Sequence, residues 1–145
     1  MPEYTLVKVE TPGDWDHYHS IRRQVLFEAR GLSDYDPNEP DEHKPENLSL
    51  LLKHEGVPIG TVRLDTRPDD IAIVRLVAIR TDYQRCGHGR VLLRKTEELA
   101  GRLGLRELCV HAAPDAVMFY EKLGYSRHVF DPESSGKSIQ MRKSI

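Results

Sequence analysis

Two glycines, Gly87 and Gly89, stand one residue apart in the stretch DYQRCGHGRVLL, which covers residues 82–93. The apolar spacing that follows predicts an amphipathic helix whose first turn carries both glycines. The first N–H groups of a helix have no partner within the helix, and the helix dipole adds positive charge there. Because glycine lets an anion approach the backbone closely, the stretch predicts a phosphate or diphosphate site. The alternative is that the glycines only shape a tight turn.

The two common nucleotide-binding motifs do not fit this stretch. A dinucleotide fingerprint would need a third glycine at position 92, where Leu92 stands, and the Gly-Lys-Ser/Thr of a phosphate-binding loop is absent. What remains, from Gln84 to Gly89, is the pattern Q/R-x-x-G-x-G/A. Both common nucleotide-binding motifs therefore fail for this stretch.

The elements around the loop follow the order β-α-β-β-β-α-β-α-β-β. Strands are expected at residues 5–9, 48–54, 59–65, 71–79, 107–111, 125–130 and 138–142. Helices are expected at residues 14–30, from about 88 to 103, and from about 114 to 123, with Asp14 as the first N-cap and with Gly31 and Gly104 as stops. Because hairpins and helical crossovers both occur, we expect an α/β fold with a mixed sheet of about seven strands and helices on both faces.

Composition narrows the class of protein. The length of 145 residues suits a single domain over residues 1–145, and 21 basic against 23 acidic side chains argue against a nucleic-acid partner. Cys86 and Cys109 form no CxxC pair, which speaks against a zinc cluster or a disulfide framework. No apolar run approaches the roughly 20 residues that a bilayer span needs. We expect a cytoplasmic protein with no membrane partner.

A second motif supports a family resemblance. The loop follows a strand ending in Val77-Ala78-Ile79, and residues 116–125 read AVMFYEKLGY. Both segments, with the order of elements, resemble the GNAT N-acetyltransferase superfamily, whose loop binds acyl-CoA and whose later helix carries A-x-x-F-Y-E-K-L-G-F. The resemblance spans nearly the whole chain. It implies acetyl-CoA as co-substrate, no metal, and a fold that often forms homodimers.

The resemblance also assigns roles to residues. It places the diphosphate on backbone N–H groups of residues 85–90, and the pantetheine arm along the main chain of Val77 and Ile79, where the fourth and fifth strands splay apart. Tyr120 would protonate the departing thiolate, unless it is only a core aromatic residue. Ala113 stands where many relatives have an asparagine that touches the CoA arm. The expected cofactor-binding residues are Val77, Ala78, Ile79, Gln84, Arg85, Cys86, Gly87, His88, Gly89 and Arg90.

The implied reaction is direct attack of a primary amine on the thioester in a ternary complex. An amine with a pKa near 10.4 costs roughly 4.6 kcal/mol to deprotonate at pH 7, so a general base is needed. His43, His111 and Asp65 are the candidates. In relatives a main-chain N–H near Val77 would polarise the carbonyl. His17 and His19 lie on different faces of the first helix, which argues against a metal site.

Two arginines suggest what the acceptor carries. Arg75 interrupts an otherwise apolar strand, a costly position unless it is paired or faces a cleft. With Arg22 of the first helix, which borders the cleft in relatives, it would suit a carboxylate or phosphate on a small-molecule amine. The alternative is an internal ion pair, for example between Arg75 and Asp65.

Two other functions remain open at this point. The acidic segment 34–46 could line a groove for a basic peptide, which would make the chain a protein or peptide N-acetyltransferase. A chain that kept the fold but lost the chemistry would be a non-catalytic acyl-CoA-binding module.

Overall fold

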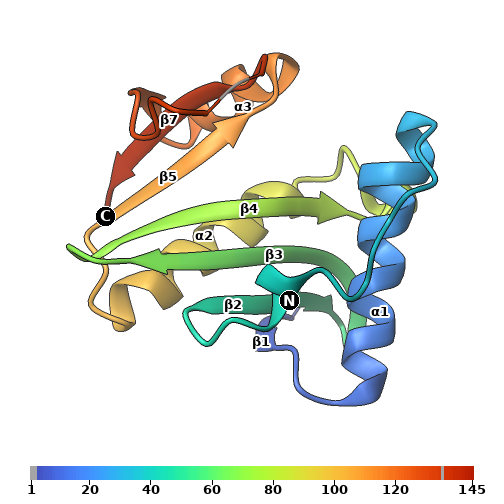
Figure 1. Cartoon of the computed structure of the whole chain (residues 1–145). Helices are drawn as coiled ribbons and strands as arrows, with labels where there is room; N and C mark the ends of the chain where they lie inside the picture. Colours follow the sequence, from blue (N-terminus) through green and yellow to red (C-terminus); the bar gives the residue numbers. More distant parts are fainter. Residues whose placement is uncertain (1–2, 135) are drawn as a thin grey trace.

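A seven-stranded mixed sheet organises the computed structural model, which describes residues 3–134 and 136–145 (Figure 1). The order of strands across the sheet is β1-β2-β3-β4-β5-β7-β6; β4 and β5 are parallel, and all other neighbours are antiparallel. The strands are β1 (Tyr4–Lys8), β2 (Asn47–His54), β3 (Val57–Arg67), β4 (Ile71–Ile79), β5 (Glu107–Ala112), β6 (Ser126–Arg127) and β7 (Ile139–Ser144). The α-helices are α1 (Pro12–Arg22), α2 (His88–Arg102) and α3 (Val117–Lys122). The predicted α/β architecture is confirmed.

Helices cover both faces of the sheet, because successive residues of a strand point to opposite faces. In β2, Leu50 and Leu52 belong to the core cluster that contains Leu92 of α2, whereas Leu51 belongs to the cluster that contains Tyr18 of α1. Residues of α3 share the α2 cluster. The sheet therefore separates α1 from α2 and α3.

The start of α1 differs from the predicted N-cap. Thr11 caps the helix: its hydroxyl accepts from the Asp14 backbone N–H at 3.0 Å, and the Asp14 carboxylate accepts from the Thr11 backbone N–H at 3.4 Å. This reciprocal pair is a capping box, with Pro12 at the first helical position, where its missing N–H costs nothing. Asp14 therefore occupies the third position rather than the cap.

The end of this helical segment changes type before it stops. After Arg22 the chain makes a π turn over Arg23–Phe27 and a 3₁₀ turn over Glu28–Arg30, and Gly31 ends it in the left-handed region at φ 75°. The predicted stop at Gly31 is confirmed, while the predicted regular helix up to it is wrong. Single π turns inside helices are frequent at functional sites.

Other boundaries follow the sequence closely. β4 covers the predicted residues 71–79, and α2 ends before Gly104, whose φ is 85°. The predicted strand 125–130 shortens to two residues, and Ser135 of the predicted turn lies outside the described residues. Of the helices in the described ranges, none combines the length and apolar character needed to cross a bilayer.

Candidate active site

β4 and β5 are paired along the first part of their length and then diverge. Their parallel pairing runs from Ile71 opposite Glu107 to Val74 opposite Val110 and goes no further, although both strands continue. β5 stays paired with β7 up to Ala112. The sheet therefore opens into a wedge at the carboxyl ends of β4 and β5, as Figure 1 shows.

A β-bulge in β4 lies at the edge of this wedge. Between Arg75 and Ala78, β4 has one residue more than the facing part of β3, so Leu76 and Val77 fall out of register. Leu76 has φ 56°, a left-handed conformation that costs a non-glycine residue about 1–2 kcal/mol. A bulge leaves an unpaired residue and re-aims the backbone. The bulge therefore interrupts the regular pairing of β4 with β3 at Leu76 and Val77.

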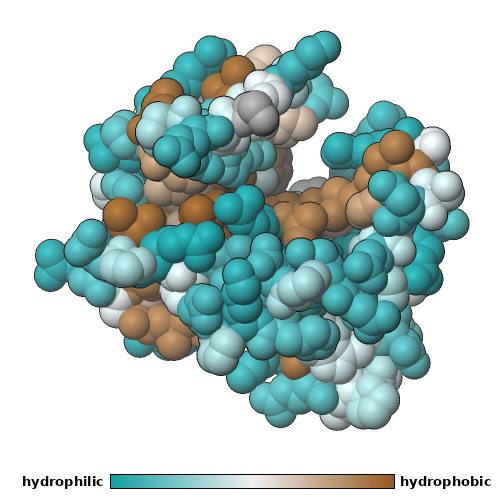
Figure 2. All heavy atoms as spheres, viewed as in Figure 1, coloured by the Kyte–Doolittle hydropathy of each residue, from teal (hydrophilic) through white to brown (hydrophobic). Residues whose placement is uncertain are grey.

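The wedge contains a cavity of about 450 Å³. Figure 2 shows the surface hollowed between the β5–β7 part and the end of the α1 segment, with apolar side chains gathered in the hollow. The wedge cavity brings together four predicted site residues, Arg75, Val77, His111 and Tyr120, and also Ala113. The other lining residues are Leu26, Phe27, Arg30, Val74, Leu76, Val110, Ala112 and Ala116.

The loop before α2 presents bare backbone. Arg85 and Gly87 both have left-handed φ values, 64° and 84°, and Gly87 is the N-cap of α2. Among the described residues, no side chain caps this helix start. Its first N–H groups are therefore open to an anion, as predicted from the glycines. The Gln84 amide instead donates to the Ile79 carbonyl at 2.8 Å, which braces the loop against β4.

His88, the first residue of α2, points into the protein. Its Nδ1 lies 2.8 Å from the Tyr4 hydroxyl of β1, and its ring centroid is 5.0 Å from that of His54 of β2. Burial and the nearby His54 lower the pKa of His88, so its imidazole is neutral at pH 7. This cluster ties the loop to the edge of the sheet. No local sequence pattern predicts this cluster, since its members come from three separate elements.

Tyr120 lies at the α3 side of the wedge. Its side chain is 6% exposed and packs edge-on against Phe119 and Tyr125, with ring centroids 5.1 Å and 5.4 Å away. Burial raises the pKa of Tyr120 to about 12. The hydroxyl therefore keeps its proton at neutral pH and can donate it.

His111 projects into the same cavity from β5. Its ring packs against Phe130 at 4.9 Å between centroids, and its Nε2 lies 3.9 Å from an Asp131 carboxylate oxygen. Burial lowers the pKa of His111, as does the charge of Arg75, and together they outweigh the opposing pull of Asp131. The imidazole is therefore neutral at pH 7 and can accept a proton.

Arg75 makes the ion pair that was the alternative to acceptor binding, yet it still lines the cavity. Its Nε lies 2.9 Å from Asp65, and its side chain is 33% exposed. Arg63 holds the same carboxylate from β3, through Nε at 2.7 Å and Nη2 at 3.0 Å. Arg63 also lies 4.0 Å from Glu39 and 3.9 Å from Glu42. Arg75 thus shares Asp65 with Arg63 and remains partly exposed beside the cavity.

Arg22 occupies a different place. Its side chain is 4% exposed and pairs with the buried carboxylate of Glu42, which also accepts hydrogen bonds from Tyr18 and Ser49. Arg22 lies outside the lining of the wedge cavity. Its charge is neutralised within the protein.

The two other base candidates also lie outside this cavity. His43 packs against Trp15 with ring centroids 5.2 Å apart, beside a separate hollow of about 190 Å³. Asp65 is 2% exposed and held by its two arginines. Of the three candidates, the structure brings only His111 together with Tyr120.

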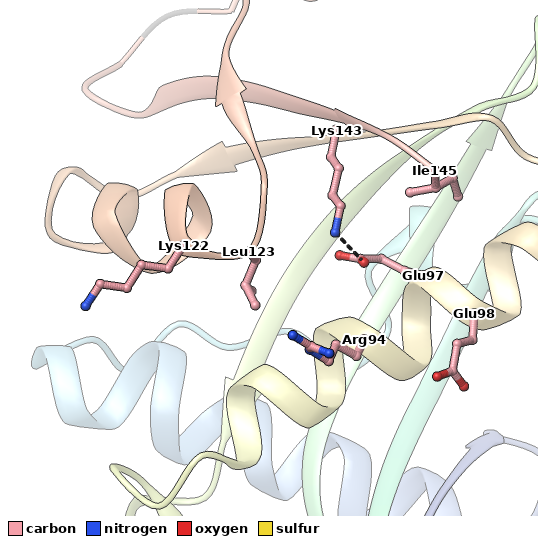
Figure 3. A pocket seen from close by; sticks show the side chains of 7 residues that line it. All are labelled: Arg94, Glu97, Glu98, Lys122, Leu123, Lys143 and Ile145. Carbon is pink, nitrogen blue, oxygen red and sulfur yellow. Dashed lines mark hydrogen bonds and ion pairs between the residues drawn. The ribbon is translucent and has the colours of Figure 1, made fainter.

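A further cavity of about 460 Å³ lies between α2, the end of α3 and β7 (Figure 3). Across it, Lys143 donates to Glu97 at 2.8 Å. None of the predicted site residues is among those that line it. The residues are Arg94, Glu97, Glu98, Lys122, Leu123, Lys143 and Ile145.

Comparison with known proteins identifies the family. The sequence model of the acetyltransferase (GNAT) family matches residues 15–125, most of the chain. The Bacillus subtilis (strain 168) protein YyaT is 29% identical over 119 residues, which cover 81% of this chain and 80% of YyaT. The chain belongs to the GNAT acetyltransferase family.

Solved structures share the fold. A proposed N-acetyltransferase from Lactobacillus plantarum superposes with a TM-score of 0.82 at 26% identity and covers 97% of each chain. The PaiA N-acetyltransferase from Thermoplasma acidophilum, solved with coenzyme A, has a TM-score of 0.76 at 16% identity and covers 99% of each chain. At that identity the second likeness concerns the fold alone.

Proposed function

We propose that this chain transfers an acetyl group from acetyl-CoA to the primary amine of a small molecule, by direct attack in a ternary complex. The observation that carries the proposal is the wedge cavity, which is lined by the bulged part of β4 and by the buried Tyr120. The uncapped start of α2 lies outside this lining, beyond the end of β4. Family membership supports acyl transfer, and the coenzyme A bound to the related fold from Thermoplasma acidophilum supports the cofactor.

The proposed cofactor position follows the open backbone. The diphosphate would bind the amides at the start of α2, around Gly87 and Gly89, in the field of the helix dipole. The pantetheine arm would extend along β4 at Val77 and Ile79 into the wedge, in the manner of an added strand. The bulge at Leu76 would aim a backbone N–H at the thioester carbonyl, where negative charge develops during attack.

The proton transfers fall to two residues of the wedge cavity. His111, neutral at pH 7, would accept the proton that the amine loses as its nitrogen bonds to the acetyl carbon. Tyr120 would give its proton to the sulfur as the carbon–sulfur bond breaks. The products are an N-acetylated amine and free coenzyme A, and solvent then returns the two residues to their starting states.

The charge balance of the cavity favours an acceptor with an anionic group. Arg75 shares Asp65 with Arg63, and its side chain is one-third exposed where it lines the cavity. An acceptor carboxylate could take a bidentate pair from the Arg75 guanidinium. Arg22 is already paired with Glu42, so it would not bind the acceptor.

A small acceptor fits better than a basic peptide. Two of the six acidic side chains of segment 34–46 are paired internally: Glu42 is buried on Arg22, and Asp41 pairs with Lys44 at 2.6 Å. Less negative charge therefore remains to attract a peptide.

A thiol-release assay tests the proposal. The intact chain with acetyl-CoA is expected to release coenzyme A when small amines are added, and less when basic peptides replace them. Tyr120→Phe should lower kcat by about a hundredfold, because it removes the acid that serves the thiolate, while calorimetry should show unchanged acetyl-CoA affinity. If acetyl-CoA binds but neither amines nor peptides cause release, the chain is an acyl-CoA-binding module instead.

A further inference from the structure

Another cavity, of about 380 Å³, adjoins the wedge cavity on the α1 side of the sheet and is the second cavity at this site. The two cavities share Arg75. Ile71, Ile73 and Arg75 alternate along β4 and so project from one face, which places the second cavity next to the first. Its volume falls within the range of roughly 300 to 1,000 Å³ that is usual for small-molecule sites.

The second cavity is mostly apolar. Ile71 and Ile73 of β4 form its floor with Cys109 of β5, and Phe130 forms a wall. The wall is firmly held, because the Gln140 side chain accepts from the backbone N–H of Phe130 at 2.9 Å and of Asp131 at 2.8 Å. Gln140 also donates to the Asp131 carbonyl at 2.8 Å. The cavity is therefore preorganised to bury a small apolar group.

Opposite charges flank the place where the two cavities meet. Arg75 lies on one side, and Asp131, with its side chain 42% exposed, lies on the other beside His111. A carboxylate would pair with Arg75, while an ammonium group would be attracted by Asp131 and would lie next to His111. Arg67, exposed, adds a second cation to the lining. The junction is thus suited to a zwitterion.

We propose that the acceptor is a free α-amino acid with an apolar side chain, an inference that rests on the proposed N-acetyltransferase function. The three groups on its α-carbon match the three features: the amine faces His111 and the thioester, the carboxylate binds Arg75, and the side chain enters the second cavity. The bound ammonium first loses one proton to His111, which passes it to solvent. The neutral amine nitrogen then bonds to the acetyl carbon and passes its second proton to His111. The carbon–sulfur bond breaks, and the thiolate takes the proton of Tyr120.

The test is a comparison of kcat/KM among matched amines, with acetyl-CoA and the intact chain. Leucine should exceed 3-methylbutylamine, which is leucine without its carboxylate, by about tenfold to a hundredfold, because a charged hydrogen-bonded pair is lost. Leucine should exceed serine by roughly tenfold or more, because the apolar contact is lost.

Variants connect these preferences to the residues. Arg75→Gln should bring leucine down toward the level of 3-methylbutylamine, and Phe130→Ala should reduce the advantage of leucine over serine. Val129→Ala is the matched control: Val129 is adjacent, 65% exposed and outside both cavities, so both preferences should persist. Calorimetric binding of acetyl-CoA shows that each variant is folded.

The outcomes separate the inference from the proposed function. Equal kcat/KM for leucine and 3-methylbutylamine would overturn the amino-acid inference and leave the N-acetyltransferase proposal standing. A preference unchanged by Arg75→Gln and Phe130→Ala would also overturn it. If no amine is acetylated although acetyl-CoA binds, the proposed function and the inference fail together.

Discussion

The proposed site has two parts of different construction, the loop before α2 and the wedge cavity. On the cofactor side, the loop from Gln84 to Arg90 offers backbone amides shaped by left-handed residues. On the acceptor side, the surface is made of side chains, Arg75 and His111 foremost, held by ion pairs and packing. A backbone site depends on local conformation, which glycine spacing reveals. A side-chain site depends on contacts between elements far apart in the chain, which spacing conceals.

Changing the backbone should have the largest effect. Gly87→Val places a β-branched residue where φ is 84°, so the loop must change shape. If the diphosphate loses two charge-assisted hydrogen bonds, each worth about 1.5–3 kcal/mol, the affinity for acetyl-CoA should fall by about a thousandfold. Isothermal titration calorimetry measures this directly.

Gly101→Val is the matched control for that change. Gly101 lies in the same helix, and an added Cβ would meet nothing within 4 Å. Its affinity should equal that of the unsubstituted chain. Full affinity in Gly87→Val would show that the cofactor does not depend on this loop.

The buried ion pair of Arg22 and Glu42, which lies outside the wedge cavity, should affect folding rather than substrate affinity. Glu42→Gln leaves the Arg22 charge buried without its partner and should cost about 3 kcal/mol of unfolding free energy, with KM for both substrates unchanged. Urea denaturation gives the first quantity, and steady-state kinetics give the second. A raised acceptor KM at full stability would instead place Arg22 in the acceptor site.

The pH dependence of stability offers a check on the same pair. Burial alone would raise the pKa of Glu42. The hydrogen bond and the charge of Arg22, together with hydrogen bonds from Ser49 and Tyr18, outweigh burial and lower this pKa. Its stabilisation is therefore complete above the unfolded pKa of about 4.3 and is lost as pH falls through the lower folded value. Because Glu42→Gln has no carboxyl to protonate there, its unfolding free energy should fall less than that of the unsubstituted chain as the pH drops through this range.

A side-chain change in the acceptor half should alter the pH profile. Because the pKa of His111 is lowered, kcat should rise with pH below 6.5 and level off at neutral pH, where the imidazole is deprotonated. His111→Gln should lower kcat by about a hundredfold and remove this rise. A profile that keeps the same rise in the variant would assign the base to another group.

The smallest effect should come from the hydrogen bond between Tyr4 of β1 and His88 at the start of α2. Tyr4→Phe removes the hydroxyl that contacts His88 at 2.8 Å and should weaken acetyl-CoA binding about fivefold, as one ordinary hydrogen bond is lost. Tyr125→Phe removes a hydroxyl that donates to Glu97 at 3.1 Å, away from the loop, and serves as control. Equal affinities for these two variants would mean that the Tyr4 contact does not position the loop.

The same contrast explains what the sequence could predict. The apolar run from Ile71 to Ile79, the glycines of the loop and the order of elements depend on local patterns. They predicted the fold, which is confirmed, and the cofactor loop, which stays a prediction. The bulge at Leu76 and the π turn after Arg22 have no local signature, since leucine and arginine are ordinary residues in strands and helices. They form because the surrounding packing outweighs local preference.

The acceptor side was the least predictable part. Arg75 stood out as a cation in an apolar strand, but the sequence could not show whether Asp65 would neutralise it. Phe130 and Asp131 belong to a predicted hairpin, and only the packing of that hairpin beside His111 brings them to the cavity. The expectation of one domain over residues 1–145 stays a prediction.

A crystal structure of the chain with coenzyme A tests the central claim most directly. The account predicts diphosphate oxygens about 2.7–3.2 Å from backbone nitrogens between Gly87 and Arg90, with the thiol end in the wedge near Tyr120. A diphosphate bound elsewhere, or a loop whose amides are filled by the protein's own side chains, would contradict it.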